Sequence, residues 1–350
     1  MKDVIQIGMR SIGVGRRVFI IAEAGVNHNG DLKQALELVD AAAAAGADAV
    51  KFQTFAADRL VTRLSPKAKY QRETTDLKES QYAMLKKLEL SPEAHRELKL
   101  RAEKHDMVFL STPFDPESAD LLDSLGVQAF KLGSGELTDR PLLEHIARKD
   151  RPTILSTGMS TMAEVQEAVL TLHEAGLSEI ALLHCVSAYP APVDDVNLRA
   201  MHTLRKRFGV PVGYSDHTQG IRVAVLAVAA GADIIEKHLT LDRTLSGPDH
   251  RMSLEPKEFT AMVRDIRDAE KILGNGNKQV MQSEANTKAV ARKSVVALVD
   301  IKKGRPLTRE MLGIRRPGLG IQPSELESLI GRKLDRDVPA GSSLYPEWLV

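Results

Sequence analysis

The stretch GADIIEKHLTLDRTLSGPDH, residues 231–250, decides the fold, because an apolar run of strand type ends there in several ionisable side chains. The apolar residues are followed at once by Glu236, Lys237 and His238. In barrels of parallel strands, the catalytic groups gather at the carboxyl ends of the strands. The stretch therefore predicts a buried strand that delivers its last side chains to a polar site.

The same pattern occurs twice upstream. The run VPVGYSD, residues 210–216, ends in Ser215 and Asp216 and is followed by His217. The run QAFKLGSGE, residues 128–136, carries polar and charged groups from its centre to its end. Because parallel strands present their carboxyl ends at one edge, we expect these side chains to meet at one place.

Strand-like runs alternate with amphipathic helical stretches over the first three quarters of the chain. The strand-like runs cover residues 18–25, 49–55, 107–114, 129–135, 152–158, 179–185, 211–216 and 233–238. Eight such βα units over about 250 residues predict an α/β fold, a (β/α)8 TIM barrel. An open doubly wound sheet is the rival, but the first strand is not followed by the glycine fingerprint that such sheets usually carry.

Residues 70–81 lie between the second strand and its helix, and they are too polar and too long for a plain loop. We interpret them as an active-site flap, with a mobile surface loop as the alternative. No Asn occurs in this segment, so the residue that contacts a substrate from it stays open.

Composition narrows the function classes. At 350 residues, with 43% hydrophobic residues, the chain can bury a large core. Lys and Arg total 48 against 47 for Asp and Glu, and aromatics make up 4%, which disfavours nucleic acid as a partner. A single cysteine excludes an intramolecular disulfide framework. The first residues have no apolar signal core, and no run approaches the ~18 apolar residues of a membrane span, so we expect no membrane association and a cytoplasmic location.

After Gly274 the pattern changes to a polar linker and then to short strands and turns. The segments 300–308 and 337–345 repeat the frame D-[IV]-x-x-G-x-x-L, which indicates a small pseudo-symmetric β-rich module unless the similarity is chance. We expect a barrel domain over residues 1–275, a linker over 276–291 and the small module over 292–350.

Nine motifs occur in order along nearly the whole chain: IAEAGVNHNG, GADAVKFQTF, FLSTPFD, FKLGSGE, PTILSTGMS, LLHCVSAYPAP, GYSDHTQG, EKHLTLDRTLSGPDH and RRPGLGI. Together they resemble the sialic acid synthases. The resemblance implies a metal-dependent barrel that condenses phosphoenolpyruvate with an N-acylated hexose. It also implies a C-terminal antifreeze-like (SAF, β-clip) domain, to which the module at 292–350 is similar.

The implied reaction joins C3 of phosphoenolpyruvate to the aldehyde of the open-chain sugar, with the aldehyde polarised by a metal. Water then adds to C2, phosphate leaves by C–O cleavage, and the product is a nine-carbon 2-keto acid. We expect an N-acetylneuraminate synthase acting on N-acetylmannosamine. The alternative is an N,N′-diacetyllegionaminate synthase acting on 2,4-diacetamido-2,4,6-trideoxymannose, and no motif distinguishes the two sugars.

Phosphoenolpyruvate carries a phosphate and a carboxylate, so its site needs cations and hydrogen-bond donors. Lys51 and Lys131, at predicted strand ends, are positioned to supply the charge. The hydroxyl donors expected at or just beyond the strand ends are Thr112, Ser134, Ser156, Ser187 and Ser215. For any one of these hydroxyls, a local turn hydrogen bond is the alternative.

His217 and His238 follow the last two predicted strands, which are neighbours in a closed barrel. Two imidazoles leave most of a six-coordinate shell to water and substrate, an arrangement that suits a Lewis-acid metal rather than a closed zinc site. We expect manganese, with magnesium or cobalt as alternatives. Hydrogen bonding by either histidine is the competing interpretation.

The remaining assignments follow from the resemblance. It implies that Glu23 handles protons on the added water and that Glu236 orients a metal-bound water. It places the acceptor sugar near Gln53, Glu136, Tyr189, Asp249 and Arg316. Because Arg316 lies in the tail, the resemblance also implies a domain-swapped homodimer in which this residue reaches the partner's barrel.

Two other function classes stay open. A Schiff-base aldolase would use Lys51, Lys131 or Lys237 covalently, and a non-enzymatic carbohydrate-binding protein would bind sugar without releasing phosphate. Borohydride trapping and phosphate release distinguish these classes from a metal-dependent synthase.

Overall fold

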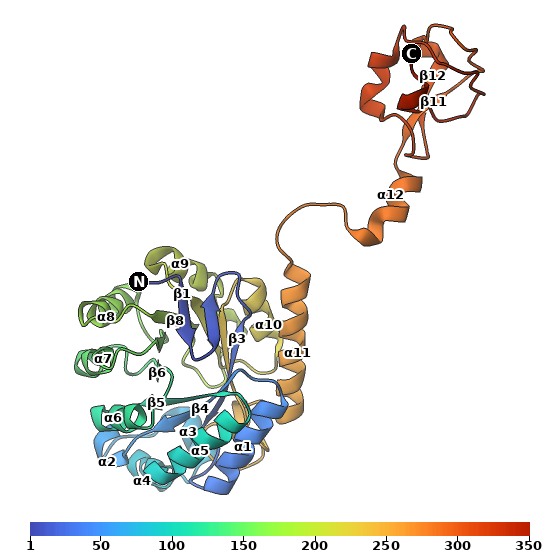
Figure 1. Ribbon diagram of the computed structural model, residues 1–350. Coiled ribbons are helices and arrows are strands. Elements are labelled where there is room, and N and C mark those ends of the chain that lie inside the picture. The colour runs from blue at the N-terminus through green and yellow to red at the C-terminus, as the bar shows by residue number, and fades with distance from the viewer. The chain divides into compact units, whose positions relative to one another are not determined.

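The computed structural model describes all residues, Met1–Val350, and the chain divides into two compact units (Figure 1). The first unit is Met1–Gly274 and the second is Asn275–Val350. Each unit has its own hydrophobic core.

The first unit is built on an eight-stranded parallel sheet. The first and last strands of the hydrogen-bonded order contact each other, which closes the sheet into a barrel. This closed arrangement confirms the predicted TIM barrel. In order around the barrel, the strands are β5 (Val108–Pro113), β4 (Ala49–Thr54), β3 (Phe19–Gly25), β10 (Ile234–His238), β9 (Val212–Asp216), β8 (Ile180–Cys185), β7 (Thr153–Ser156) and β6 (Phe130–Leu132).

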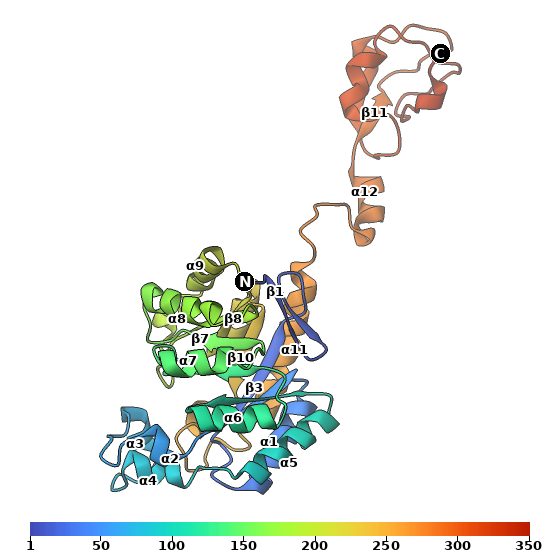
Figure 2. The ribbon, with the colours of Figure 1, turned by 60° about the vertical axis from the view of Figure 1, so that its left-hand side comes forward.

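Helices surround the strands, as Figure 2 shows. Several begin at a side chain that accepts a hydrogen bond from the first turn, as Asp31, Ser91 and Thr161 do. No helix of the structure combines the length and the apolar character that crossing a bilayer requires. The helices that follow the eight strands are α1 (Leu32–Ala44), α5 (Pro92–Lys104), α6 (Pro116–Ser124), α7 (Arg140–Ala147), α8 (Met162–Glu174), α9 (Arg199–Phe208), α10 (Arg222–Ala229) and α11 (Pro256–Leu273).

The side chains of each strand alternate between the barrel interior and the surrounding helices. On β10, Ile234 packs in the interior cluster, whereas Ile235 packs in the cluster shared with the helices. The same alternation turns Glu236 and His238 inward and Lys237 outward. The sequence parity of each strand therefore decides which of its polar residues reach the site.

An amino-terminal hairpin, which the sequence did not predict, closes one end of the barrel. Its strands are β1 (Val4–Ile7) and β2 (Arg10–Gly13), paired antiparallel. Ile5, Ile7 and Ile12 are buried in the interior cluster with residues from the beginnings of the barrel strands. Only the opposite end, where the strands finish, is left for a site.

The segment between β4 and α5 folds into the short helices α2 (Ala57–Leu60), α3 (Lys69–Thr74) and α4 (Gln81–Lys86). The buried Lys67 fixes the turn between α3 and α4. Its Nζ donates to Oγ1 of Thr75 at 2.8 Å, to the carbonyl of Asp76 at 2.7 Å and to Oε1 of Glu79 at 3.0 Å. The predicted flap is thus an ordered pair of helices in this structure.

The first α-helix of the second unit is α12 (Ala285–Ala291), a short helix in the region expected as a linker. Its sheet pairs β11 (Ser294–Ala297) with β12 (Leu312–Arg315) antiparallel. The two copies of the repeated frame also pair: Ile301 and Val338 exchange backbone hydrogen bonds, each of 2.8 Å. Six short 3-10 helices complete the list of regular elements. They are Val193–Asp195, His250–Met252, Gln282–Glu284, Arg309–Met311, Pro323–Leu329 and Pro346–Trp348.

Candidate active site

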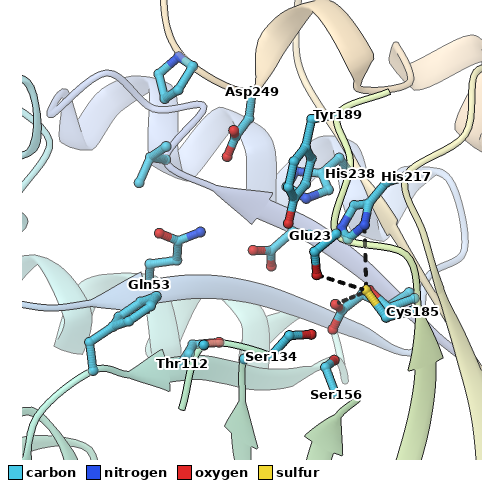
Figure 3. Close-up of a pocket in the computed structure, with 18 of the residues that line it drawn as sticks. Glu23, Gln53, Thr112, Ser134, Ser156, Cys185, Tyr189, His217, His238 and Asp249 are labelled. Carbon is cyan, nitrogen blue, oxygen red and sulfur yellow. Dashed lines mark hydrogen bonds between the residues drawn. The ribbon is translucent and has the colours of Figure 1, made fainter. Parts of the chain in front are cut away.

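A cavity of about 380 Å³ opens at the carboxyl ends of the barrel strands (Figure 3). Every site residue expected in the barrel lines it, so the structure brings these residues together. They are Glu23, Lys51, Gln53, Thr112, Lys131, Ser134, Glu136, Ser156, Ser187, Tyr189, Ser215, His217, Glu236, His238 and Asp249.

Two lysines and two glutamates form a buried charge cluster at the floor of the cavity. Nζ of Lys51 lies 2.8 Å from Oε2 of Glu23 and 3.8 Å from Oε2 of Glu236. Nζ of Lys131 lies 3.7 Å from Oε1 of Glu236. All four side chains are at most 6% exposed. Buried charges of this kind are tolerated because opposite charges compensate one another.

Hydroxyl groups surround this cluster and are aligned by it. Lys131 Nζ donates to Ser156 Oγ at 2.8 Å, and Lys51 Nζ donates to Thr112 Oγ1 at 3.3 Å. The backbone N–H of Gly158 donates to Ser134 Oγ at 2.9 Å. Because each hydroxyl oxygen accepts from the protein, its own proton remains free to be donated to a ligand. The floor can therefore offer both positive charge and O–H donors to an anion.

The two glutamates of the cluster differ in protonation. Burial raises the pKa of Glu23 to about 7, although the charge of Lys51 opposes the shift, and the neighbouring Glu236 adds to it. Burial would also raise the pKa of Glu236, but Lys131, Lys51 and the hydrogen bond from Ser215 together lower it below its usual range. Glu236 is thus a carboxylate at neutral pH, whereas Glu23 is poised to gain or lose a proton.

His217 and His238 lie side by side above the cluster, with ring centroids 5.4 Å apart. Nδ1 of His217 is 2.9 Å from the carbonyl of Val186, a contact that makes Nδ1 the donor and leaves Nε2 free. His238 is buried, its Nδ1 has no hydrogen-bond partner, and burial lowers its pKa well below 6.5. Burial lowers the pKa of His217 too, but contacts with Cys185 and Val186 outweigh it, so that its pKa is raised above 6.5. Two adjacent imidazoles, each with a free nitrogen, fit a divalent metal once His217 has lost its proton.

No group of three or more His, Cys, Asp or Glu side chains is arranged to hold a metal. If the two imidazoles hold a metal, the rest of its coordination shell would come from water or substrate oxygens. Cys185 lies beside this pair, its Sγ 3.6 Å from Nδ1 of His217.

Lys237 does not belong to the site. Its Nζ donates to Oδ2 of Asp216 at 2.9 Å and to the carbonyl of Thr218, and the lysine and aspartate side chains are at most 1% exposed. This ion pair lies on the outward face of the strands, as the alternation on β10 requires. Of the three lysines considered for a Schiff base, only Lys51 and Lys131 face the cavity.

Polar groups expected near a sugar line the upper part of the cavity. Tyr189 contacts the ring of His217, with centroids 4.3 Å apart, and the ring of Tyr70, with centroids 4.8 Å apart. Burial raises the pKa of Asp249 to about 6, and burial also raises the pKa of Glu136. Because Tyr70 belongs to α3, the predicted flap supplies part of the cavity wall.

Several lining residues were not predicted from the sequence. Gln71 lies in the predicted flap without having been singled out, and the single cysteine, Cys185, was used only to exclude a disulfide framework. An apolar group formed by Val26, Met84, Leu85 and Phe114 also lines the cavity. The sequence held one usable signal for Gln71, since it is an amide next to an aromatic residue within the polar segment.

Arg316 is the one expected site residue outside the barrel. It follows β12 in the second unit and is exposed. Its role toward the sugar therefore stays a prediction that rests on the resemblance.

Comparison with known proteins identifies the family. A model of the NeuB family matches residues 38–278, and a model of the SAF domain matches residues 292–350. The chain is 49% identical over 344 residues to the N,N′-diacetyllegionaminic acid synthase of Legionella pneumophila, covering 97% of both chains. It is 49% identical over 319 residues to the enzyme of the same name from Campylobacter jejuni, covering 91% of this chain and 96% of that one.

Among solved structures, the chain is similar to the N-acetylneuraminic acid synthetase of Leptospira borgpetersenii, solved in complex with citrate. The identity is 39%, the match covers 82% of this chain and 95% of that chain, and the TM-score is 0.72. The family model spans more than half of the chain, and the curated relatives match it over nearly their whole length. The chain belongs to the NeuB family of sialic-acid-type synthases.

Proposed function

We propose that this protein is an N,N′-diacetyllegionaminate synthase, which condenses phosphoenolpyruvate with 2,4-diacetamido-2,4,6-trideoxymannose. The observation that carries the proposal is the 49% identity to two synthases of that name, against 39% to the sialic acid synthetase. The alternative acceptor considered from the sequence is thus better supported than N-acetylmannosamine, which we expected first.

Phosphoenolpyruvate is proposed to bind on the charged floor. Its phosphate and carboxylate would approach Lys51 and Lys131, with the protons of the surrounding hydroxyls directed at their oxygens. The floor hydroxyls assigned to this subsite are Thr112, Ser134, Ser156, Ser187 and Ser215, although Ser215 already donates its proton to Oε1 of Glu236 at 2.9 Å.

His217 and His238 are proposed to hold the metal, for which manganese is our first choice before magnesium or cobalt. When bound, a divalent metal supplies Lewis-acid polarisation of the sugar aldehyde. The hydrogen bond from His217 Nδ1 to the carbonyl of Val186 orients this ring toward the cavity. Glu236, which is charged at neutral pH, can accept a hydrogen bond from a water beside the histidines and so orient that water.

Glu23 is proposed to remove the proton from the water that adds to C2. Its pKa of about 7 lets it accept that proton at neutral pH and release it afterwards. Lys51, at 2.8 Å, holds the carboxylate in place and stabilises its charged form. The resulting tetrahedral carbon loses phosphate by C–O cleavage.

The acceptor sugar is proposed to lie against Gln53, Glu136, Tyr189 and Asp249, and to receive Arg316 from the tail of a partner chain. In this proposal the protein is a homodimer with exchanged tails, located in the cytoplasm. The barrel would extend over residues 1–275, the linker over 276–291 and the SAF domain over 292–350.

A phosphate-release assay tests the function and the sugar together. Purified protein with manganese and phosphoenolpyruvate should release phosphate when 2,4-diacetamido-2,4,6-trideoxymannose is added, and much more slowly with N-acetylmannosamine. Faster release with N-acetylmannosamine would restore the sialic acid assignment. Trapping of the protein by borohydride with pyruvate, together with activity that survives chelation, would favour a Schiff-base aldolase.

A further inference from the structure

Four apolar side chains gather on one side of the cavity. Val26, Met84, Leu85 and Phe114 all line the cavity and belong to one hydrophobic cluster. Val26, Met84 and Leu85 are buried, and Phe114 packs against them. We refer to these four residues as the apolar wall. None of their side chains carries an oxygen or nitrogen atom, so the wall cannot pair with a hydroxyl group.

The apolar wall lies over one side of the barrel mouth. Val26 follows β3, Met84 and Leu85 lie on α4 after β4, and Phe114 follows β5. These three strands are consecutive in the barrel with β4 at the centre, and the strand opposite β4 is β8. The two histidines end β9 and β10, and Figure 3 shows them across the cavity from Gln53, the side chain near the end of β4.

This placement orients an open-chain sugar. Its aldehyde, C1, must meet phosphoenolpyruvate between the charged floor and the histidines. If the rest of the carbon chain extends away from β9 and β10 toward the β4 side of the mouth, its far end, C6, approaches the apolar wall.

We propose that the apolar wall binds a methyl carbon at C6 and so selects a 6-deoxy acceptor over a 6-hydroxy one. The inference rests on the proposed function and deepens it, because it assigns the selection to particular residues. A methyl group gains by burial against these side chains. A hydroxyl group in contact with these four side chains loses water and cannot pair with them.

The test compares two acceptors that differ only at C6: 2,4-diacetamido-2,4,6-trideoxymannose and its 6-hydroxy counterpart. A hydrophobic pocket rejects an added hydroxyl by roughly 10- to 100-fold in kcat/KM, so the wild type should prefer the 6-deoxy sugar by a ratio in that range. Equal kcat/KM values for the two sugars would overturn the inference while leaving the synthase function intact. No phosphate release with either sugar would overturn the proposed function and the inference with it.

Two variants place a hydrogen-bonding group in the wall: Met84→Gln and Leu85→Asn. Each should lower the preference ratio by about tenfold and leave the KM for phosphoenolpyruvate unchanged, since neither touches the charged floor. The matched control is Leu88→Ala, because Leu88 packs in the same cluster but does not line the cavity. The conservative Leu85→Met should keep the wild-type ratio. If both polar variants keep the wild-type ratio of kcat/KM for the two sugars and show normal circular dichroism, the apolar wall does not select the group at C6.

Discussion

Oε2 of Glu23 lies 2.8 Å from Nζ of Lys51, and both side chains are buried beneath the cavity. The pair joins β3 to β4, where Glu23 and Lys51 stand in register. The charge of the lysine stabilises the carboxylate, yet burial outweighs it and brings the pKa of Glu23 to about 7. The geometry therefore couples a buried cation directly to a group that titrates near neutral pH.

Activity should depend on the ionisation of Glu23. If its carboxylate takes the proton of the added water, kcat/KM for phosphoenolpyruvate should rise as the pH rises through about 7, because this ratio reports ionisations of the free enzyme. Glu23→Gln should abolish most turnover and remove that inflection from the residual rate. A pH profile of phosphate release measures both, and an unchanged inflection in the variant would assign it to another group.

The same group should affect stability, with a sign fixed by the direction of the shift. The folded pKa of Glu23 lies above the unfolded value of 4.5, so its contribution to stability is fully present below pH 4.5 and is lost as the pH rises to about 7. Glu23→Gln should therefore show a smaller loss of the free energy of unfolding between pH 5 and pH 8 than the wild type. The lowered pKa of Glu236 acts below pH 4.5, outside this window. Urea unfolding of the wild type and of Glu23→Gln at pH 5 and pH 8 measures this difference in the free energy of unfolding.

His217→Ala or His238→Ala should abolish turnover and leave the fold intact, because both side chains end strands and face the cavity rather than the core. Calorimetric titration with manganese should show binding to the wild type and none to either variant. His173→Ala, an exposed histidine on α8, is the control and should behave like the wild type. Full activity in both site variants after exhaustive chelation would exclude the metal mechanism.

Lys131→Met should weaken phosphoenolpyruvate binding by about 1.5–3 kcal/mol, the scale of a hydrogen bond to a charged group. The KM for phosphoenolpyruvate should then rise by roughly 10- to 150-fold, while the KM for the sugar stays constant. Steady-state kinetics with each substrate varied in turn separates the two effects. A rise confined to the KM of the sugar would mean that Lys131 belongs to the sugar subsite and not to the phosphoenolpyruvate subsite.

The sequence was sufficient to predict the barrel and the residues that line most of its cavity. The alternation of side chains along each strand determines which residues face the barrel interior and which face the helices. On each strand the interior residues alternate with residues that face the helices, so the polar residue in phase with Ile234 on β10 had to enter the cavity. The same parity explains why Lys237 is a structural partner of Asp216 and not a site residue.

Two features could not be predicted for physical reasons. The hairpin of β1 and β2 is short, and its burial depends on the barrel end that it covers, which is remote in sequence. The apolar wall on α4 has the pattern of an ordinary core helix, because Met84 and Leu85 face both the cluster and the cavity. Only the folded chain distinguishes a core position from a cavity wall.

The proposed role of Arg316 toward the sugar rests on the family resemblance alone. Subunit exchange can test this role. Residues 275–281 contain no helix or strand and stand at the start of the second unit. If tails are exchanged, each active site takes its barrel from one chain and Arg316 from the other. Arg316→Ala should then lose sugar affinity, and His238→Ala should lose turnover, in their respective homodimers.

Mixing the two variants should restore activity. In a heterodimer with exchanged tails, one site combines an intact barrel from the Arg316→Ala chain with an intact tail from the His238→Ala chain. The other site carries both defects, so each heterodimer should reach about half the activity of a wild-type dimer. Native mass spectrometry counts the heterodimers in the same mixture. Heterodimers without recovered activity would mean that the tail serves its own barrel or none, because only exchange between chains can place the two intact halves in one site.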